Sequence, residues 1–471
     1  MTLTKHDYFF SKETDSFEEK LKYYAYTENI SKKPFTIALI IPPSPQQPTP
    51  GREFLITGPF EGFTYIATLI KKMGFGINVI DCRLKENPEE YALARIDDAI
   101  VVGISNFADS FNFVEVFSKM AKTKFPEKLI MLGGPLVTSI PDVLLENTSA
   151  DFAIIGEGEL TLIEFLEKFL IENNREFDGI KGIVYKKDGK IVHNPSRPQI
   201  KNLDNLPLMD YTIWPNYEDI IKNGQILISS TRGCPHNCSF CFKTIPMLRL
   251  KSIERFEEEV AYLKKTTNFN YTWLNDLNYN VYEDRAIAIC DILQKYGIRY
   301  HVFTRVINVH KPLMEKLKAT GCLGVWFGLE SYEQEILDLN RKDTTIEDID
   351  TAMKIAGDAG LAVRGLFIVG LYGETEEALE RMVEYIRKGT FLPLVKYLVP
   401  FPGTSIYYHA LETGKIKDTV EFLRFMSQRK IRDNDDELVN VTDLDEAVIR
   451  KYFHQIWQIT KERENNPIYC Q

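Results

Sequence analysis

The sequence has 471 residues, of which 44% are hydrophobic and 26% are charged, and its formal net charge is -10. This length exceeds what one ordinary hydrophobic core supports, so we expect two or three domains. The acidic balance disfavours nucleic acid as a partner. No apolar stretch is long enough to span a bilayer, and residues 1–33 lack the apolar core of a secretory signal, so we expect a cytoplasmic protein.

Strands alternate with helices through the first third of the chain, after an N-terminal extension at 1–34. The predicted strands cover 37–41, 77–81, 99–105, 129–134 and 152–156, and the predicted helices cover 60–73, 113–121, 141–146 and 160–172. This alternation is typical of an α/β fold with a parallel, doubly wound sheet, so residues 35–175 are predicted to form a Rossmann-like domain. Such a sheet binds ligands beyond the carboxyl ends of its strands. The sequence places there a proline-rich loop and the segments ISNFADS, GGPLVTS and GEGEL.

A second alternating series follows a hairpin and a proline-punctuated linker at 176–222. Its predicted strands cover 226–230, 271–276, 300–304, 324–330, 361–370 and 395–401, with helices at 257–264, 284–296, 312–319 and 346–358 between them. Six β/α units make most of a TIM barrel, so residues 223–405 are predicted to form a partial (β/α)6 barrel with its site at the strand carboxyl ends. Residues 406–471 are predicted to be a helical C-terminal region with an acidic stretch at 433–437.

Three of the seven cysteines, Cys234, Cys238 and Cys241, lie in the segment TRGCPHNCSFCF directly after the first strand of this series. Clustered thiolates bind zinc, copper(I) or an iron–sulfur cluster. A structural zinc site needs a fourth Cys or His, and His236 is awkwardly placed, two residues from each neighbouring cysteine. Three cysteines on four irons leave one iron open for a substrate. We therefore favour a [4Fe-4S] cluster, with zinc as the alternative.

The C-x3-C-x2-C spacing, with Phe240 just before the last cysteine, resembles the radical S-adenosylmethionine (SAM) superfamily. In that family the open iron is chelated by SAM, and an electron from the cluster cleaves SAM to a 5'-deoxyadenosyl radical that abstracts hydrogen from the substrate. The resemblance therefore implies that the three cysteines are both metal ligands and catalytic residues. It also implies an electron donor such as flavodoxin or ferredoxin as a partner.

Later segments extend the resemblance to the end of the predicted barrel. By that resemblance, TWLNDLNYN assigns Asp276 to the methionyl end of SAM, and VFTRV assigns Arg305 to its carboxylate, to which a guanidinium can donate two parallel hydrogen bonds. GLES assigns Glu330 and Ser331 to the ribose and methionyl groups, and GLFIVGLYGET places Gly370 beside the adenine. Singly, a charged residue at a strand end is more often part of a surface ion pair; the order of these segments behind the cysteine motif favours the binding role.

The first domain resembles the cobalamin-binding domain of one large subgroup, which includes the anaerobic magnesium-porphyrin cyclase and hopanoid methylase groups. The matching pieces are the proline-rich loop, VVGIS, LGGP and IGEGE, and the resemblance implies corrin-binding roles for Ser105, Gly133, Gly134, Pro135, Gly156, Glu157 and Gly158. Small residues at strand ends let a bulky ligand approach the backbone. No histidine occurs between residues 37 and 175, so cobalt would receive no histidine from this domain. The alternative is an empty Rossmann-like domain used for packing or for substrate.

These features favour a cobalamin-dependent radical SAM methylase that acts on an unactivated carbon. The alternative is a non-methylating radical enzyme, such as a cyclase, ring-contraction enzyme, dehydratase or epimerase, with or without cobalamin. A methylthiotransferase is disfavoured, because that group carries three further cysteines in its first domain and this one has only Cys82. A zinc-bound, non-enzymatic protein is the minor alternative. The substrate, a small molecule or a peptide, is not specified by the sequence.

Overall fold

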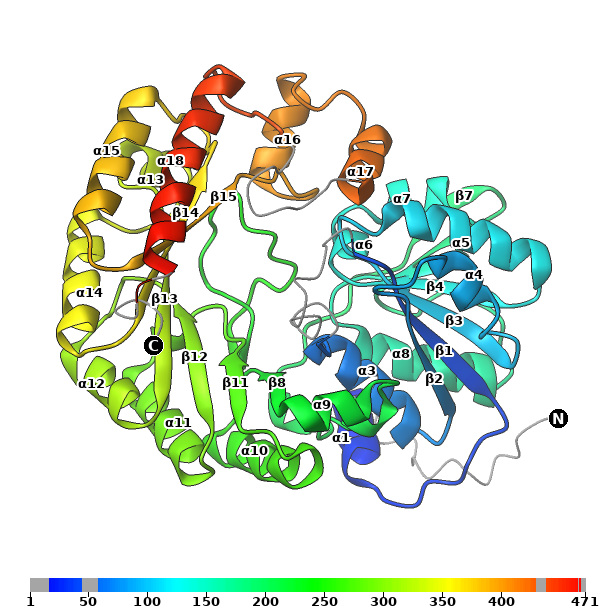
Figure 1. Cartoon of the computed structure of the whole chain (residues 1–471). Helices are drawn as coiled ribbons and strands as arrows, with labels where there is room; N and C mark the ends of the chain where they lie inside the picture. The colour runs from blue at the N-terminus through cyan, green and yellow to red at the C-terminus, as the bar shows by residue number, and fades with distance from the viewer. Residues whose placement is uncertain (1–16, 45–57, 429–437, 465, 467–471) are drawn as a thin grey trace. The chain divides into compact units, whose positions relative to one another are not determined.

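The computed structural model describes residues 17–44, 58–428, 438–464 and 466, and shows an α/β protein (Figure 1). The chain divides into two compact units, Met1–Asp219 with Asp418–Arg429, and Ile220–Lys417 with Lys430–Gln471. Most of the predicted proline-rich loop, the acidic stretch at 433–437 and Cys470 lie outside the described residues.

The sheet of the first unit has seven strands in the order β2-β1-β3-β4-β5-β6-β7. β1 to β5 run parallel, as predicted, and β6 and β7 form an antiparallel hairpin that pairs with β5. The hairpin, predicted as part of a linker, thus extends this sheet. The strands are β1 (Thr36–Ile41), β2 (Gly76–Asp81), β3 (Ala99–Ser105), β4 (Leu129–Gly133), β5 (Phe152–Ile154), β6 (Ile183–Lys187) and β7 (Lys190–His193).

Helices cover both faces of this sheet, which is why its central strands are almost continuous apolar runs (Figure 1). They are α1 (Phe17–Tyr26), α3 (Glu61–Lys72), α4 (Pro88–Leu93), α5 (Phe111–Lys124), α6 (Pro135–Ser139), α7 (Pro141–Asn147) and α8 (Gly158–Leu166), which continues into a π-helical turn at Glu167–Ile171. α1 lies in the segment predicted as an extension, where Tyr24 and Lys20 both bond to Glu167 at 3.0 and 2.6 Å. Pro135, predicted in a loop, begins α6.

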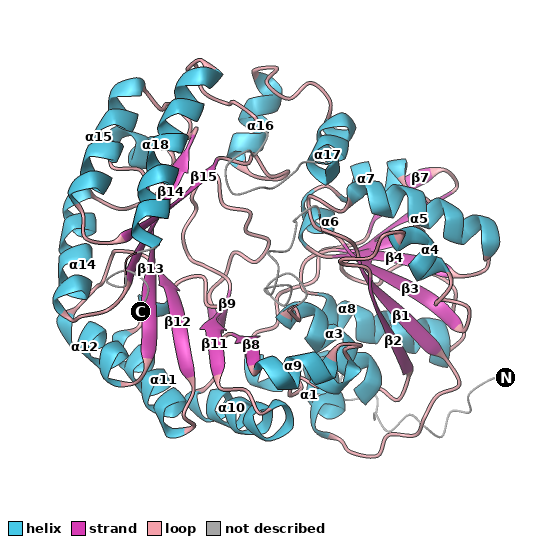
Figure 2. Ribbon diagram, viewed as in Figure 1, coloured by secondary structure: helices cyan, strands magenta, loops and turns pink. Residues whose placement is uncertain are grey.

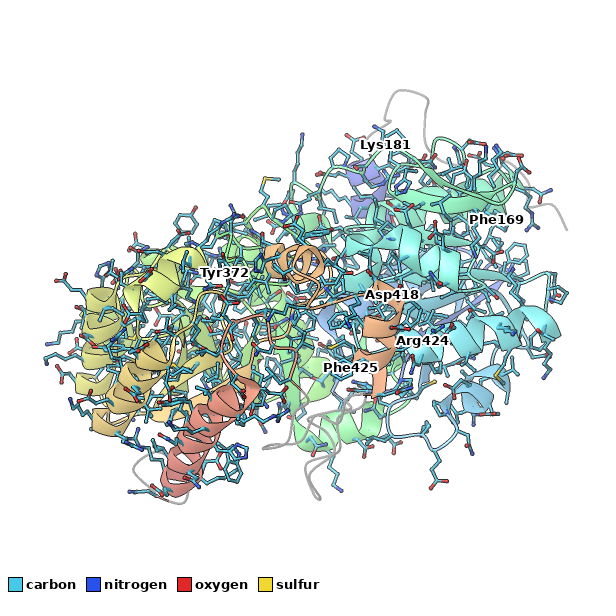
Figure 3. All side chains as sticks on the ribbon, turned by 90° about the horizontal axis from the view of Figure 1, so that it is seen from above. Phe169, Lys181, Tyr372, Asp418, Arg424 and Phe425 are labelled. Carbon is cyan, nitrogen blue, oxygen red and sulfur yellow. The ribbon has the colours of Figure 1, made fainter. Side chains whose placement is uncertain are left out.

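One helix of the C-terminal region belongs to the first unit. α17 (Thr419–Gln428) packs on α5, where Arg424 forms an ion pair with Glu115 at 2.6 Å and the Asn112 N–H donates to Ser427 Oγ at 3.2 Å. Figure 3 labels Arg424 and Phe425 on this helix. The region predicted as one helical segment, 406–471, is therefore divided between the two units.

The second unit is built on six parallel strands in the order β15-β14-β13-β12-β11-β8, so each strand pairs with the next in sequence. The strands are β8 (Gln225–Ile228), β11 (Tyr271–Leu274), β12 (Arg299–Thr304), β13 (Cys322–Glu330), β14 (Val363–Val369) and β15 (Leu392–Tyr397). Side chains of β14 alternate strictly between buried and half-buried. One face of the sheet is therefore packed under helices, and the other is more open.

The covering helices lie on one side of this sheet (Figure 2). They are α10 (Ile253–Thr267), α11 (Glu283–Lys295), α12 (Lys311–Ala319), α13 (Gln334–Leu339), α14 (Ile346–Asp358), α15 (Glu376–Lys388) and α18 (Glu446–Glu464); α9 (Tyr217–Asn223) precedes β8, and α16 (Ser405–Glu412) follows β15. α10, α14, α15 and α16 each begin after a Ser or Thr whose hydroxyl accepts a backbone N–H of the first turn. The sequence interpretation had named no helix at α1, α4, α6 or α9.

We predict that Gly134→Ala destabilises the first unit by about 1–3 kcal/mol, the range for a strained backbone position. Gly134 has a φ of 106°, and a Cβ there would lie 2.7 Å from the Asn106 carbonyl oxygen. Gly133→Ala is the matched control, because in the part of the chain that the structure describes its Cβ would meet no atom within 4 Å. Urea unfolding of both variants tests the prediction, and equal stabilities would contradict it.

Candidate functional site

The three predicted cluster ligands lie in one loop that leaves the carboxyl end of β8. A two-stranded antiparallel ribbon, β9 (Thr231–Arg232) with β10 (Arg249–Leu250), closes this loop at its base. Gly233 begins the loop with a φ of 86°, and a Cβ there would lie 2.1 Å from the Met247 carbonyl oxygen. Glycine is therefore required at this position for the chain to turn into the cysteine segment.

The buried carboxylate of Asp276 fixes the root of this loop. It follows β11 and accepts four hydrogen bonds, from the N–H and hydroxyl groups of Ser230 and Thr231, at 2.7 to 2.8 Å. The resemblance had assigned Asp276 to the methionyl end of SAM. In the structure its carboxylate ties the end of β11 to the residues that follow β8.

A buried ion pair also supports the root of this loop. Lys251 and Glu259 are each 1% exposed and 2.5 Å apart, and Lys251 Nζ also donates to the Ser229 carbonyl at 2.7 Å. Arg285 donates to the carbonyl of Ser230 at 3.0 Å. Charged hydrogen-bond partners thus hold consecutive peptide groups directly before the cysteine motif.

The cysteine thiols are close enough to interact electrostatically. Burial of its thiol and the neighbouring Cys238 and Cys234 raise the pKa of Cys241 to about 11, while Lys243 and Lys342 oppose the increase. Arg305 Nη1 donates to Cys238 Sγ at 3.4 Å. Within the described residues, no group of three His, Cys, Asp or Glu side chains is arranged to hold a single metal ion. Three coupled thiols beside several cations fit an anionic iron–sulfur cluster.

Arg305, predicted to bind the SAM carboxylate, lies at the end of β12 and is 6% exposed. Its Nη2 donates to the Asp343 carbonyl and to Thr344 Oγ1 at 3.3 and 3.2 Å. Its Nε is buried and has no hydrogen-bond partner among the described residues. An unpaired buried donor on a guanidinium beside the cysteine loop fits a carboxylate ligand.

Glu330 and Ser331 lie at the carboxyl end of β13, where the pairing with β14 is irregular. Glu330 has a φ of 65° and forms an ion pair with the buried Lys342 at 2.7 Å. A left-handed glutamate at a strand end is a strained conformation of the kind found at binding sites. Ser331 is 1% exposed. The half-buried Phe240 lies between the second and third cysteines in the loop.

Gly370 follows β14 with a φ of 93°, and its N–H donates to Glu374 Oε2 at 2.6 Å. Glu374 is 4% exposed, and its Oε1 is buried without a hydrogen-bond partner among the described residues. Burial raises the pKa of Glu374 to about 8, although backbone N–H groups of Gly370 and Leu371 oppose the shift. The sequence interpretation missed this residue; the signal was the acid in GLYGET, four residues after the predicted glycine.

The predicted corrin-binding residues occupy the carboxyl ends of β3, β4 and β5. Gly133 ends β4, and Cβ atoms at Gly133 and Gly156 would meet no atom of the described residues within 4 Å, so both glycines border space that those residues leave open. Gly158 begins α8, and Glu157 Oε2 accepts the N–H of Ile200 at 2.9 Å. Ser105 ends β3 beside Gly133. Open space over glycines at strand ends fits a large, flat ligand such as a corrin.

The chain matches the sequence model of the radical SAM superfamily over residues 228–386 and that of the B12 binding domain over residues 58–166. An uncharacterized methyltransferase of Pyrococcus horikoshii is 30% identical over 393 residues, which cover 80% of this chain and 84% of that protein. This chain belongs to the radical SAM superfamily. As a radical SAM enzyme with a B12-binding domain, it uses a four-iron, four-sulfur cluster, SAM and cobalamin as cofactors.

Two further proteins are similar to this radical SAM enzyme at lower sequence identity. An anaerobic magnesium-protoporphyrin IX monomethyl ester cyclase of Rubrivivax gelatinosus is 28% identical, over 72% of this chain and 63% of the cyclase. The radical SAM methyltransferase TsrM from Kitasatospora setae, solved with cobalamin and its cluster, aligns with a TM-score of 0.67 at 15% identity, over 92% of this chain and 90% of TsrM. That likeness shows a shared fold.

The structure thus gathers Cys238, Cys241 and Arg305 at one place in the second unit, and lines the strand ends of the first unit with the predicted small residues. Asp276 accepts hydrogen bonds from the residues at the root of the cysteine loop and so supports that loop. None of the helices in the described ranges is long and apolar enough to cross a membrane.

We predict a specific pH dependence from Glu374. Its folded-state pKa of about 8 lies above the ordinary value of 4.5, so the folded protein binds this proton more tightly than the unfolded chain. The resulting stabilisation is fully present below pH 4.5 and is lost as the pH rises through 8. Glu374→Gln does not titrate and should flatten the decline in unfolding free energy between pH 5 and pH 8.

The matched control for this prediction is Glu377→Gln, which replaces an exposed acid on the following helix. Denaturant unfolding at the two pH values measures both variants beside the parent protein. If Glu374→Gln retains the full pH dependence of the parent, the assignment is wrong.

Proposed function

We propose that this enzyme is a cobalamin-dependent radical SAM methylase that transfers a methyl group to an unactivated carbon. The observation that carries the proposal is the Arg305 guanidinium, which donates to Cys238 Sγ and retains a buried, unpaired Nε beside the cysteine loop. The B12-binding domain of the same chain supports the methyl-transfer part. Relatives named as methyltransferases support it too, including a cytidylyl-2-hydroxyethylphosphonate methyltransferase of Streptomyces wedmorensis at 24% identity.

In this proposal Cys234, Cys238 and Cys241 bind three irons of the cluster, and Arg305 holds the carboxylate of SAM. Glu330 and Ser331 contact the ribose and methionyl groups, Phe240 and Gly370 border the ligand, and Asp276 positions the root of the cysteine loop. When bound, these cofactors supply a 5'-deoxyadenosyl radical and a transferable methyl group. The protein's own contribution is to orient the ligand, to balance its charge and to exclude water.

The first unit would hold the corrin over Gly133, Gly134, Pro135, Gly156 and Gly158, with Ser105 and Glu157 offering polar contacts. Its five parallel strands support a Rossmann-like domain, proposed at residues 35–175. The sequential order of the six strands in the second unit supports a partial (β/α)6 barrel at residues 223–405. No histidine lies between residues 37 and 175, so this segment offers cobalt no imidazole.

The reaction needs an electron donor, for which flavodoxin or ferredoxin is suited, and a small-molecule or peptide substrate. We propose that the enzyme works in the cytoplasm. The described cysteines outside the loop, Cys82, Cys290 and Cys322, are free thiols, as expected in a reducing compartment.

A non-methylating radical reaction is the second candidate, because the chain is also similar to proteins named as anaerobic cyclases. The two candidate reactions convert SAM to different products. Methylation releases both S-adenosylhomocysteine, when a methyl group leaves SAM, and 5'-deoxyadenosine, when SAM is cleaved reductively. A cyclase releases only the second product.

The test is anaerobic reconstitution with iron, sulfide and cobalamin, followed by incubation with SAM and dithionite. We predict that both products form in the parent protein. Replacement of any one ligand, in Cys234→Ala, Cys238→Ala or Cys241→Ala, should remove the cluster, so each variant should lose its iron and form about 100-fold less 5'-deoxyadenosine. Cys290→Ala, which removes a buried thiol on α11, is the matched control. Deoxyadenosine without S-adenosylhomocysteine would contradict methylation, and a protein that takes up zinc but no iron would contradict both candidates.

A further inference from the structure

The turn that joins two of the three cluster ligands is held by a residue from a distant part of the second unit. The Cys241 N–H donates to the Cys238 carbonyl at 3.2 Å, so residues 238–241 form a turn with Ser239 at its second position. Ser239 is 7% exposed. Its N–H donates to the Asn340 carbonyl, and its hydroxyl donates to Asn340 Oδ1, both at 3.0 Å. Asn340 therefore makes two of the bonds that hold this turn, and the Ile406 N–H, which donates to the Ser239 carbonyl at 3.2 Å, makes a third.

Asn340 is itself fixed from two further directions. It follows α13 and is 1% exposed. Its Nδ2 donates to the carbonyls of Ile336 and Tyr372, both at 2.9 Å. Tyr372, labelled in Figure 3, belongs to the loop after β14 that contains Gly370 and Glu374. One side-chain amide thus connects the cysteine turn, the end of α13 and the loop after β14.

These contacts also specify the chemistry of the residue. The amide oxygen faces a hydroxyl donor, and the amide nitrogen faces two carbonyl acceptors. Neither aspartate, which has no donor, nor alanine, which has neither group, can replace all three bonds. Because Ser239 and Ile336 are buried, a group left unmatched beside either of them loses its hydrogen bond without gaining water.

The residues after Asn340 include one cation of the site, Lys342, and two groups that hold another, Arg305. Lys342 pairs with Glu330, and the Asp343 carbonyl and Thr344 hydroxyl accept bonds from the guanidinium that contacts Cys238. A shift of Asn340 would therefore disturb the thiols and their neighbouring positive charges together. Hydrogen bonds and exposure around cluster sulfurs set the reduction potential and the stability of such clusters.

We propose that Asn340 is a positioning residue for the iron–sulfur cluster, acting through Ser239 on the turn between Cys238 and Cys241. This inference rests on the proposed cluster site in the cysteine loop. Asn340 does not touch the cluster; it fixes the separation and the environment of two of its ligands. Ser239 and Asn340 act as one unit, because the hydroxyl of the first bonds to the amide of the second.

The experiment compares Ser239→Ala, Asn340→Ala and the double variant after anaerobic reconstitution. Asn194→Ala is the matched control: Asn194 Nδ2 also donates to two carbonyls, those of Phe177 and Ile180, but in the first unit. The readouts are iron content, the electron paramagnetic resonance spectrum and midpoint potential of the reduced cluster, and the rate of iron release to a chelator. Thermal unfolding of each protein is recorded beside them.

We expect Ser239→Ala and Asn340→Ala to bind iron, to shift the spectrum and the potential, and to release iron about two- to tenfold faster, the range that one hydrogen bond accounts for. In the Asn340→Ala background, Ser239→Ala should add almost nothing, because its hydroxyl has already lost its partner. Asn194→Ala should match the parent in every cluster readout, whatever its melting temperature.

Ser239→Ala removes one side-chain bond and keeps the backbone bond, so it tests the proposal even if Asn340→Ala does not fold. Parent-like spectra, potentials and release rates in the folded variants would overturn the proposal, even if their melting temperatures fall. A full additional effect of Ser239→Ala in the double variant would also overturn it. A parent protein that binds no iron would instead overturn the proposed cluster site, and this inference with it.

Discussion

The convergence of four donors on the buried carboxylate of Asp276 is the interaction on which the rest of the second unit's site depends. β8 is the edge strand of its sheet, so the chain that leaves it has a neighbouring strand on one side only. Asp276, at the end of that neighbour, binds both the backbone and the side chains of Ser230 and Thr231. A carboxylate can accept this many bonds, and it is strongest as an acceptor where water is excluded. The direction in which the cysteine loop departs is set there.

Charge balance is the second constraint on this loop. The protein as a whole carries a net charge of -10, yet Arg305, Lys243 and Lys342 gather around the cysteines. Each of these cations also has a neutral or anionic partner within the second unit: carbonyl groups for Arg305 and Lys243, and Glu330 for Lys342. Their positions are therefore fixed before any ligand binds. Preorganised cations of this kind stabilise an anionic centre without the cost of reorienting solvent.

The sequence predicted the parallel strands of both units and the position of the cysteine loop, because apolar runs and clustered thiols are local signals. It did not predict that the hairpin at 183–193 would extend the sheet of the first unit or that α17 would pack in that unit. Both arrangements depend on contacts between residues far apart in the sequence, such as the ion pair of Arg424 with Glu115. Short helices such as α6 carry too few turns for a periodic pattern.

For the site, the sequence placed Asp276 and Arg305 at strand ends, and the structure finds both there. Their partners could not be read from the sequence, because Ser230 and Thr231 lie more than 40 residues from Asp276. Asn340 and Glu374 were missed for the same reason. The role of a single amide after a helix, or of a single acid after a glycine, depends on contacts and burial that only the folded structure reveals.

Different residues hold the base of the cysteine loop and the turn that contains its last two cysteines. Asp276, Lys251 and Arg285 fix the base of the loop through bonds to residues that precede the first cysteine. Asn340 fixes the far turn, where the two remaining cysteines lie. A loop held only at its base would leave its outer ligands free to move, because the constraint on a flexible chain weakens with distance along it. A second anchor at the turn is therefore needed to hold three thiols toward one centre, and it must come from a residue that the strand ends bring close.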